Sequence, residues 1–117
     1  MQDREISVFQ RVLEALERAR EVGEEALRGD STTREQDDPD CYPHGLIVTL
    51  PRTHEAWKAL RFLGKNLDWV SMESRGLLNL RPRMEMKFRT SEVIYLQAVG
   101  ESLCRDGIDC VPEIMWH

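Results

Sequence analysis

Residues 45–63 read GLIVTLPRTHEAWKALRFL and place a short apolar run directly before an amphipathic one. Residues 45–50 are rich in β-branched and aliphatic side chains, which favours a strand, and Pro51 ends that strand. Thr53 is a favourable N-cap residue, and apolar side chains then recur at three- and four-residue steps, as one face of a helix requires. These side chains are Ala56, Trp57, Leu60 and Leu63. The stretch therefore predicts a strand followed by a helix.

Three more strands and one more helix are predicted downstream. Residues 67–72 (LDWVSM) form a second apolar run, and residues 83–89 (RMEMKFR) alternate apolar with charged side chains, which is the clearest strand pattern in the chain. Thr90 or Ser91 is expected to cap a helix that runs to Leu103. Residues 109–116 then form the last strand.

The element order from residue 45 is therefore β-α-β-β-α-β. This order is typical of ferredoxin-like α+β folds, in which two helices pack on one face of a four-stranded antiparallel sheet. The last strand lies at a sheet edge in that topology, and Pro112 fits there because proline cannot donate to a strand ladder. We expect residues 45–117 to form this domain.

The N-terminal third differs in character from the predicted domain. Residues 1–28 repeat apolar side chains at helical spacing, so they predict an amphipathic helix with a solvated face of Glu and Arg that includes Arg20 and Glu24. Residues 29–44 are polar, acidic and bounded by prolines, which indicates a flexible linker. The helix is long enough either to cover the open face of the sheet or to pair with another chain.

Length and composition exclude several classes of protein. The chain has 117 residues, enough for one domain, and no apolar run approaches the roughly 18 residues of a membrane helix. No secretory signal is visible, so we expect an intracellular protein of the cytoplasm or nucleus. The net charge of −5 is uneven, because residues 1–41 carry 12 acidic and 6 basic side chains whereas residues 42–117 carry 9 and 10.

The sequence predicts neither a cofactor nor a metal. Cys41 and His44 form a C-x-x-H pair that Cys104 and Cys110 could complete as a zinc site, but structural zinc pairs usually stand two to four residues apart and the second pair is wider. Three cysteines fit reduced thiols better than a disulfide framework. No P-loop, GxGxxG, HExxH or GxSxG motif occurs, so we expect a protein that is not an enzyme.

Two function classes remain, and the first is protein interaction. An apolar stripe of Phe9, Leu13 and Leu16 on a tethered helix could bind another protein or a second copy of the chain, although such a stripe is more often an intramolecular contact. Trp116, next to the C-terminus, is a second candidate anchor. We expect a small regulatory or interaction protein, and a short arginine-rich chain without catalytic motifs would suit a viral or mobile-element accessory protein.

The second class is RNA binding. Residues 74–89 contain five basic side chains and a single acidic one, Glu85. Residues 45–51 (GLIVTLP) resemble in outline the first core motif of RNA-recognition modules. The cations are Arg75, Arg81, Arg83, Lys87 and Arg89. The predicted strand lacks outward aromatics on which bases could stack. Alternatively, the basic strand pairs with the acidic N-terminal segment of the same chain.

Overall fold

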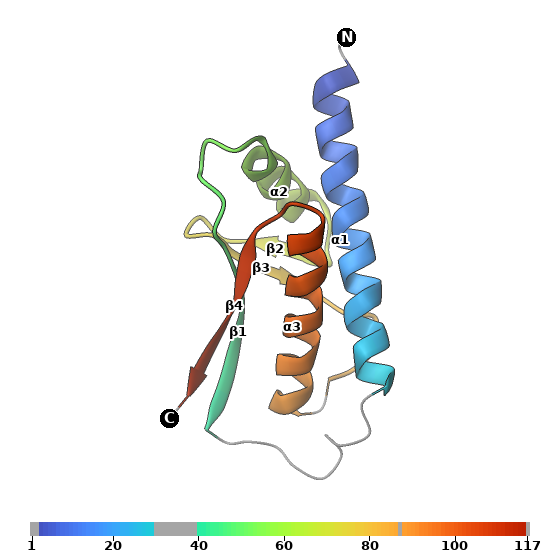
Figure 1. The fold of residues 1–117 in the computed structure, drawn as a ribbon, viewed down its shortest axis with the longest axis vertical. Helices are drawn as coiled ribbons and strands as arrows, with labels where there is room; N and C mark the ends of the chain where they lie inside the picture. The colour runs from blue at the N-terminus through green and yellow to red at the C-terminus, as the bar shows by residue number, and fades with distance from the viewer. Residues whose placement is uncertain (1–2, 30–39, 87, 117) are drawn as a thin grey trace.

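The computed structural model describes residues 3–29, 40–86 and 88–116 (Figure 1). Three helices and four strands follow one another along the chain. They are α1 (Asp3–Gly29), β1 (Cys41–Val48), α2 (Glu55–Asn66), β2 (Val70–Met72), β3 (Leu77–Leu80), α3 (Arg89–Arg105) and β4 (Cys110–Trp116). The domain boundary expected at residue 45 falls inside β1, because the strand already begins at Cys41. Of the predicted linker, residues 30–39 lie outside the described residues.

The four strands form one antiparallel sheet in the order β2-β3-β1-β4. Pro112 of β4 lies opposite Leu46 of β1, and β4 has a described neighbour on one side only. The prediction of a mixed α+β fold is therefore confirmed, and Pro112 stands in an edge strand as expected, where its missing N–H is tolerated.

One face of the sheet is covered by α2 and α3. Gly100 of α3 lies against both Leu46 and Pro112, so these two side chains point toward the helices. Their chain neighbours Ile47 and Val111 then point to the opposite face, because side chains alternate along a strand. The hydrophobic core fills the space between the helices and this sheet face.

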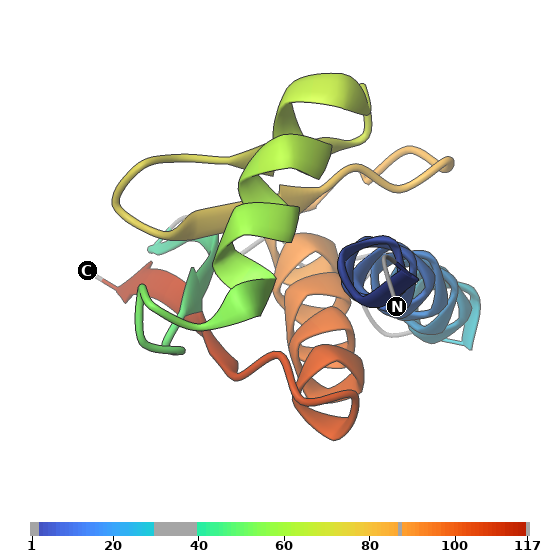
Figure 2. The ribbon, with the colours of Figure 1, turned by 90° about the horizontal axis from the view of Figure 1, so that it is seen from above.

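Helix α1 packs on the helical layer and not on the open face of the sheet. Most of its contacts are with α3, with fewer to α2, and it runs along the long axis so that its first turns extend past α2 (Figures 1 and 2). Ala15, Ala19 and Gly23 are buried and four residues apart. Small residues at this spacing let two helices approach closely, and a Cβ built on Gly23 would lie 2.6 Å from Tyr95.

The strand predicted over residues 83–89 is wrong. The third strand is Leu77–Leu80, which joins β2 through a turn whose Gly76 N–H donates to the Glu73 carbonyl at 2.9 Å. Gly76 adopts a φ of +98°, which glycine tolerates readily. Residues 81–86 have no regular secondary structure, and Met86 is half-buried against the core. Apolar and charged residues alternate here although the segment pairs with no described strand, and Met86 contacts the core from a loop.

Both predicted helix caps are also wrong. Helix α2 is capped by His54, whose Nδ1 accepts a hydrogen bond from the Ala56 N–H at 3.1 Å, and not by Thr53. Helix α3 begins at Arg89, and Phe88 at its cap position makes no side-chain hydrogen bond to the helix. The helix thus starts before the favourable cap residues Thr90 and Ser91, which lie inside it.

Candidate functional site

A buried carboxylate ties α1 to the segment that follows β3. Glu24 is 1% exposed, and it accepts hydrogen bonds from the Arg83 backbone N–H at 2.6 Å and from the Arg83 Nε at 3.1 Å. These hydrogen bonds hold the pKa of Glu24 below its ordinary value, because they favour the charged form more than burial disfavours it. The solvated face predicted for this part of the helix is therefore an internal ion-pair site.

A second arginine lies over an indole beside this ion pair. The Arg20 guanidinium stacks on the Trp69 ring at 4.6 Å from the ring centre, and its Nε lies 3.8 Å from the Glu24 carboxylate. The Arg20 Nε is buried and has no hydrogen-bond partner among the described residues. The Tyr95 hydroxyl is also buried, without a hydrogen-bond partner in the described part of the chain, and burial together with the nearby Glu24 charge raises the pKa of Tyr95.

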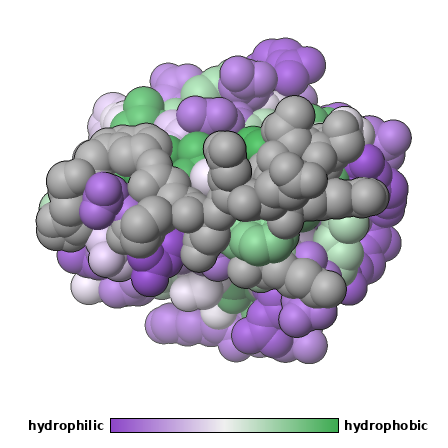
Figure 3. Space-filling view, turned by 90° about the horizontal axis from the view of Figure 1, so that it is seen from below, coloured by the Kyte–Doolittle hydropathy of each residue, from purple (hydrophilic) through white to green (hydrophobic). Residues whose placement is uncertain are grey.

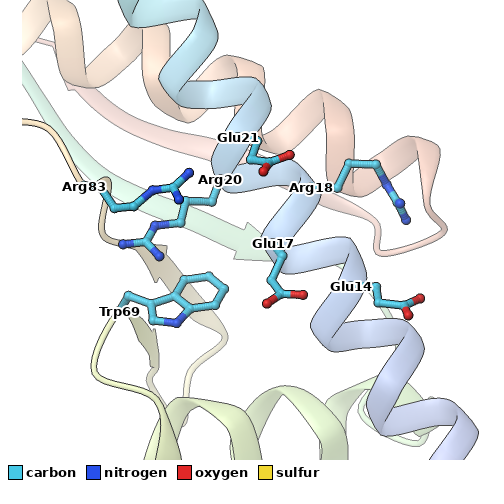
Figure 4. Close-up of a pocket in the computed structure, with 7 residues that line it drawn as sticks. All are labelled: Glu14, Glu17, Arg18, Arg20, Glu21, Trp69 and Arg83. Carbon is cyan, nitrogen blue, oxygen red and sulfur yellow. The ribbon is translucent and has the colours of Figure 1, made fainter.

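This cluster forms the wall of a surface cavity of about 500 Å³ between α1 and the start of β2. Figure 4 shows the side chains of Arg20 and Arg83 together over Trp69, with Glu17 extending from α1 on the same side. Arg18 points away toward α3, where it donates to Asp106 at 2.9 Å. The remaining lining residues are Glu14 and Glu21.

The cavity offers charge and one aromatic ring. No thiol, imidazole or aliphatic hydroxyl is found among the described residues that line it, and its three carboxylates, Glu14, Glu17 and Glu21, are exposed on α1. Its arginines are already engaged by Glu24 and Asp106. The arrangement therefore ties α1 to the segment after β3 and to the C-terminal end of α3.

A different surface lies on the open face of the sheet. Ile47 stands between Leu77 on β3 and Val111 on β4, and the three share one face. Exposure rises toward the edge of the sheet, from 4% at Leu77 to 51% at Val111. The side chains on this face are therefore buried on β3 and exposed on the edge strand β4.

Tyr42 and Met115 extend this surface toward the other end of β1 and β4. They are cross-strand partners, and Met115 shares its face with Val111 because the two are four residues apart in one strand. Both are exposed, and the Arg89 guanidinium stacks on the Tyr42 ring at 4.3 Å. We call Tyr42, Ile47, Val111 and Met115 the apolar sheet surface. The end of the molecule seen from below is hydrophilic around its rim, with smaller hydrophobic areas between (Figure 3).

The residues predicted for protein interaction are largely inside the fold. Leu16 is fully buried, and Phe9 and Leu13 are half-buried against the core, with Phe9 also edge-on to the Phe62 ring at 5.2 Å. The apolar stripe of α1 therefore makes the intramolecular contact that was the alternative to partner binding. The side chain of Trp116 lies outside the described part of the structure.

The four described residues of the predicted RNA-binding set have different surroundings. Arg75 lies at the turn between β2 and β3 and pairs with Glu73, whereas Arg83 is held by Glu24. Arg81 is exposed directly after β3, and Arg89 lies over Tyr42. Lys87 lies outside the described residues. Part of the charge complementarity between the acidic helix and the basic segment is thus internal, through Glu24 and Arg83.

The four residues considered for zinc are divided between two ends of the sheet. Cys41 pairs with Trp116 at one end of β1, and Cys110 pairs with Val48 at the other. Seven residues of a strand span roughly 20 Å, so the two pairs do not share a metal. In the described ranges, no group of three or more His, Cys, Asp or Glu side chains could hold a metal ion. Likewise, no described helix is long and apolar enough to cross a membrane.

Sequence reasoning missed Glu24 and the apolar sheet surface for different reasons. Glu24 sits in an i,i+4 pair with Arg20, which is indistinguishable in sequence from a solvated pair. The exposed side of β4 was visible as the alternation of Val111, Glu113 and Met115, although nothing local showed that this side faces solvent. Comparison with protein-family models gave no match, and comparisons with curated proteins and with solved structures gave none either.

Proposed function

We propose that this chain is a non-enzymatic protein-interaction module that binds a protein partner through the apolar sheet surface. One observation carries the proposal: Tyr42, Val111 and Met115, three of the four large hydrophobic side chains that are exposed in the described residues, share the open face of the sheet. Glu113, which is half-buried, lies between Val111 and Met115 on this face. Exposed apolar side chains that share one face mark interaction sites more often than singly scattered ones do.

The chemistry of the surface favours an apolar protein face as the partner. Glu113 is the one charged residue of β4, and it is half-buried. Charged side chains are depleted at the centres of protein interfaces, and aromatic residues and methionine are enriched there. Pro112 hinders the addition of a further strand to the edge, so we expect the partner to pack on the face of the sheet.

The proposed architecture of the domain is ferredoxin-like, with α1 as an addition to the helical layer. The β-α-β-β-α-β order of β1 to β4 with α2 and α3 supports it, as does the antiparallel order β2-β3-β1-β4. Such a sheet leaves one face free, which is where the apolar sheet surface lies.

Site-specific photocrosslinking tests the proposal. A photoreactive phenylalanine analogue at Val111 should yield crosslinked protein, either a partner from a lysate of the source cells or a second copy of the chain. The same analogue at Gln97, exposed on α3, is the matched control. An excess of unlabelled wild-type chain should compete, and the Met115→Glu chain should not. Equal products from both positions, or equal competition by both chains, would contradict the proposal.

RNA binding is the alternative use of the same surface, and the stacked pair of Tyr42 and Arg89 favours it. An aromatic ring beside a guanidinium on a sheet is a platform on which bases stack. Fluorescence anisotropy with single-stranded RNA at low salt separates the two. We expect no binding, whereas RNA binding that weakens steeply with salt and is lost in Tyr42→Ala would replace the protein-interaction proposal.

A further inference from the structure

Two thiols meet where α3 passes into β4. Cys104 lies in the last turn of α3, and its Sγ donates to the carbonyl oxygen of Cys110 at 3.3 Å. Cys110 is the first residue of β4, and its own Sγ lies 3.8 Å from the Gly100 carbonyl on the preceding turn of the helix. Each sulfur atom therefore lies against backbone of the other element, Cys104 Sγ against the start of β4 and Cys110 Sγ against α3.

The turn between them is fixed by the backbone. Gly107 adopts a φ of +85°, and its N–H donates to the Cys104 carbonyl at 3.1 Å. The Ile108 N–H donates to the Leu103 carbonyl at 2.9 Å, so the chain reverses directly after the helix. This reversal brings two residues that are six positions apart into contact, and it does so without any movement of a flexible segment.

The two thiols differ in their access to solvent. Cys104 is exposed, whereas Cys110 is 4% exposed. Burial raises the pKa of Cys110 to about 12, and the neighbouring Cys104 thiol contributes to the same shift, as expected for thiols in direct interaction. An exposed thiol that can react first, beside a buried thiol that can resolve the product, is the arrangement of a dithiol pair.

We propose that Cys104 and Cys110 are a modification site that a small-molecule disulfide such as glutathione disulfide oxidises to an intramolecular disulfide. The Cys104 thiolate attacks one sulfur of the reagent, so a new S–S bond forms to Cys104, the S–S bond of the reagent breaks, and one thiol leaves with the proton from Cys104. The Cys110 thiol then gives up its proton and attacks the Cys104 sulfur, so the S–S bond between Cys104 and the reagent breaks and the second thiol leaves with that proton. The two protein thiols lose two electrons, and the reagent gains them.

The experiment uses the full chain, reduced and then incubated with glutathione disulfide before alkylation of the remaining thiols and mass spectrometry. Wild type should end with a mass lower by two hydrogen atoms, and after digestion the peptides that contain Cys104 and Cys110 should be joined by a disulfide. Cys110→Ser should stop at a stable glutathione adduct on Cys104, because the resolving thiol is missing. Cys104→Ser should not react, because its remaining thiols are buried.

Cys41→Ser is the matched control, since Cys41 lies at the other end of β1, and it should behave as wild type. Circular dichroism checks that each variant folds, and Cys110→Ala replaces Cys110→Ser if the hydroxyl is not tolerated in the core. A wild-type chain that keeps a stable adduct on Cys104, fails to react, or forms a disulfide through Cys41 would overturn the proposal.

Discussion

The Arg83 backbone N–H and the Arg83 guanidinium both donate to the carboxylate of Glu24, which lies 59 residues earlier in the chain. The contact joins the C-terminal half of α1 to the segment between β3 and α3. A charged acceptor that is almost fully removed from solvent needs such donors, because an unpaired buried carboxylate is strongly disfavoured. The position of α1 on the helical layer therefore depends on a polar contact as well as on its apolar stripe.

Replacing Glu24 by Gln should lower the free energy of unfolding by about 1–3 kcal/mol, because hydrogen bonds to a charged acceptor are lost or weakened. Urea unfolding followed by circular dichroism measures the change. Glu25→Gln is the control on the same helix, since Glu25 is exposed and pairs with Arg28 at the surface. Its effect should stay under about 0.5 kcal/mol. Equal effects of the two substitutions would show that the buried carboxylate of Glu24 contributes no more than an exposed one.

The same pair predicts the pH dependence of stability. The pKa of Glu24 is lowered from its ordinary value of 4.5 in the folded state, so the unfolded chain binds the proton more readily. Stability from this group is therefore fully present above about pH 4.5 and is lost as the pH falls through the folded pKa. The stability difference between wild type and Glu24→Gln should be constant near neutral pH and should shrink below about pH 4.5. A difference that grows on acidification would contradict the assignment.

Gly23→Ala should destabilise the protein by about 1–3 kcal/mol through overpacking, despite the better helix propensity of alanine. A Cβ at this position would lie 2.6 Å from Tyr95 and 2.7 Å from Val99, so α1 and α3 would have to move apart. Gly29→Ala is the matched control, because nothing lies within 4 Å of a Cβ there. Thermal unfolding of both variants gives the comparison, and a stabilised Gly23→Ala chain would show that the crossing is looser than described.

Leu16→Ala should cost about 2–5 kcal/mol, the range for a leucine truncated in a core. Leu16 is fully buried between α1 and the rest of the helical layer, whereas Leu13 is half-buried and should cost less when truncated. Chemical denaturation of both variants measures the difference. A change in the free energy of unfolding close to zero for Leu16→Ala would mean that α1 is undocked for much of the time. Its apolar stripe would then be available to bind a partner.

Helical periodicity in the sequence accounts for most of the secondary structure that was predicted correctly. The apolar side chains of α1, α2 and α3 recur at helical spacing, which is a local pattern, so the sequence predicts these helices to within a few residues. The third strand was missed because Leu77–Leu80 (LLNL) is apolar at nearly every position, which removes the alternation that marks a half-exposed strand. The segment 83–89 alternates but has no strand to pair with, and strand pairing is not encoded locally.

The candidate site was less predictable because its contacts are long-range. Glu24 becomes buried only because the chain after β3 passes beside α1, and no spacing within α1 encodes that path. Similarly, the exposure of Val111 and Met115 depends on where α1 docks. Had α1 lain on the open face, the same two side chains would have been core residues.

The direction of α1 has a practical consequence for attaching the protein to a surface. Its first turns extend past α2 at one end of the long axis, and β4, which carries Met115, ends toward the other (Figure 1). An immobilisation handle joined ahead of α1 would therefore hold the molecule with Tyr42 and Met115 directed away from the support. A handle joined after β4 would crowd the strand that carries Val111 and Met115, so weak binding measured with a C-terminal tag would not describe the untagged chain.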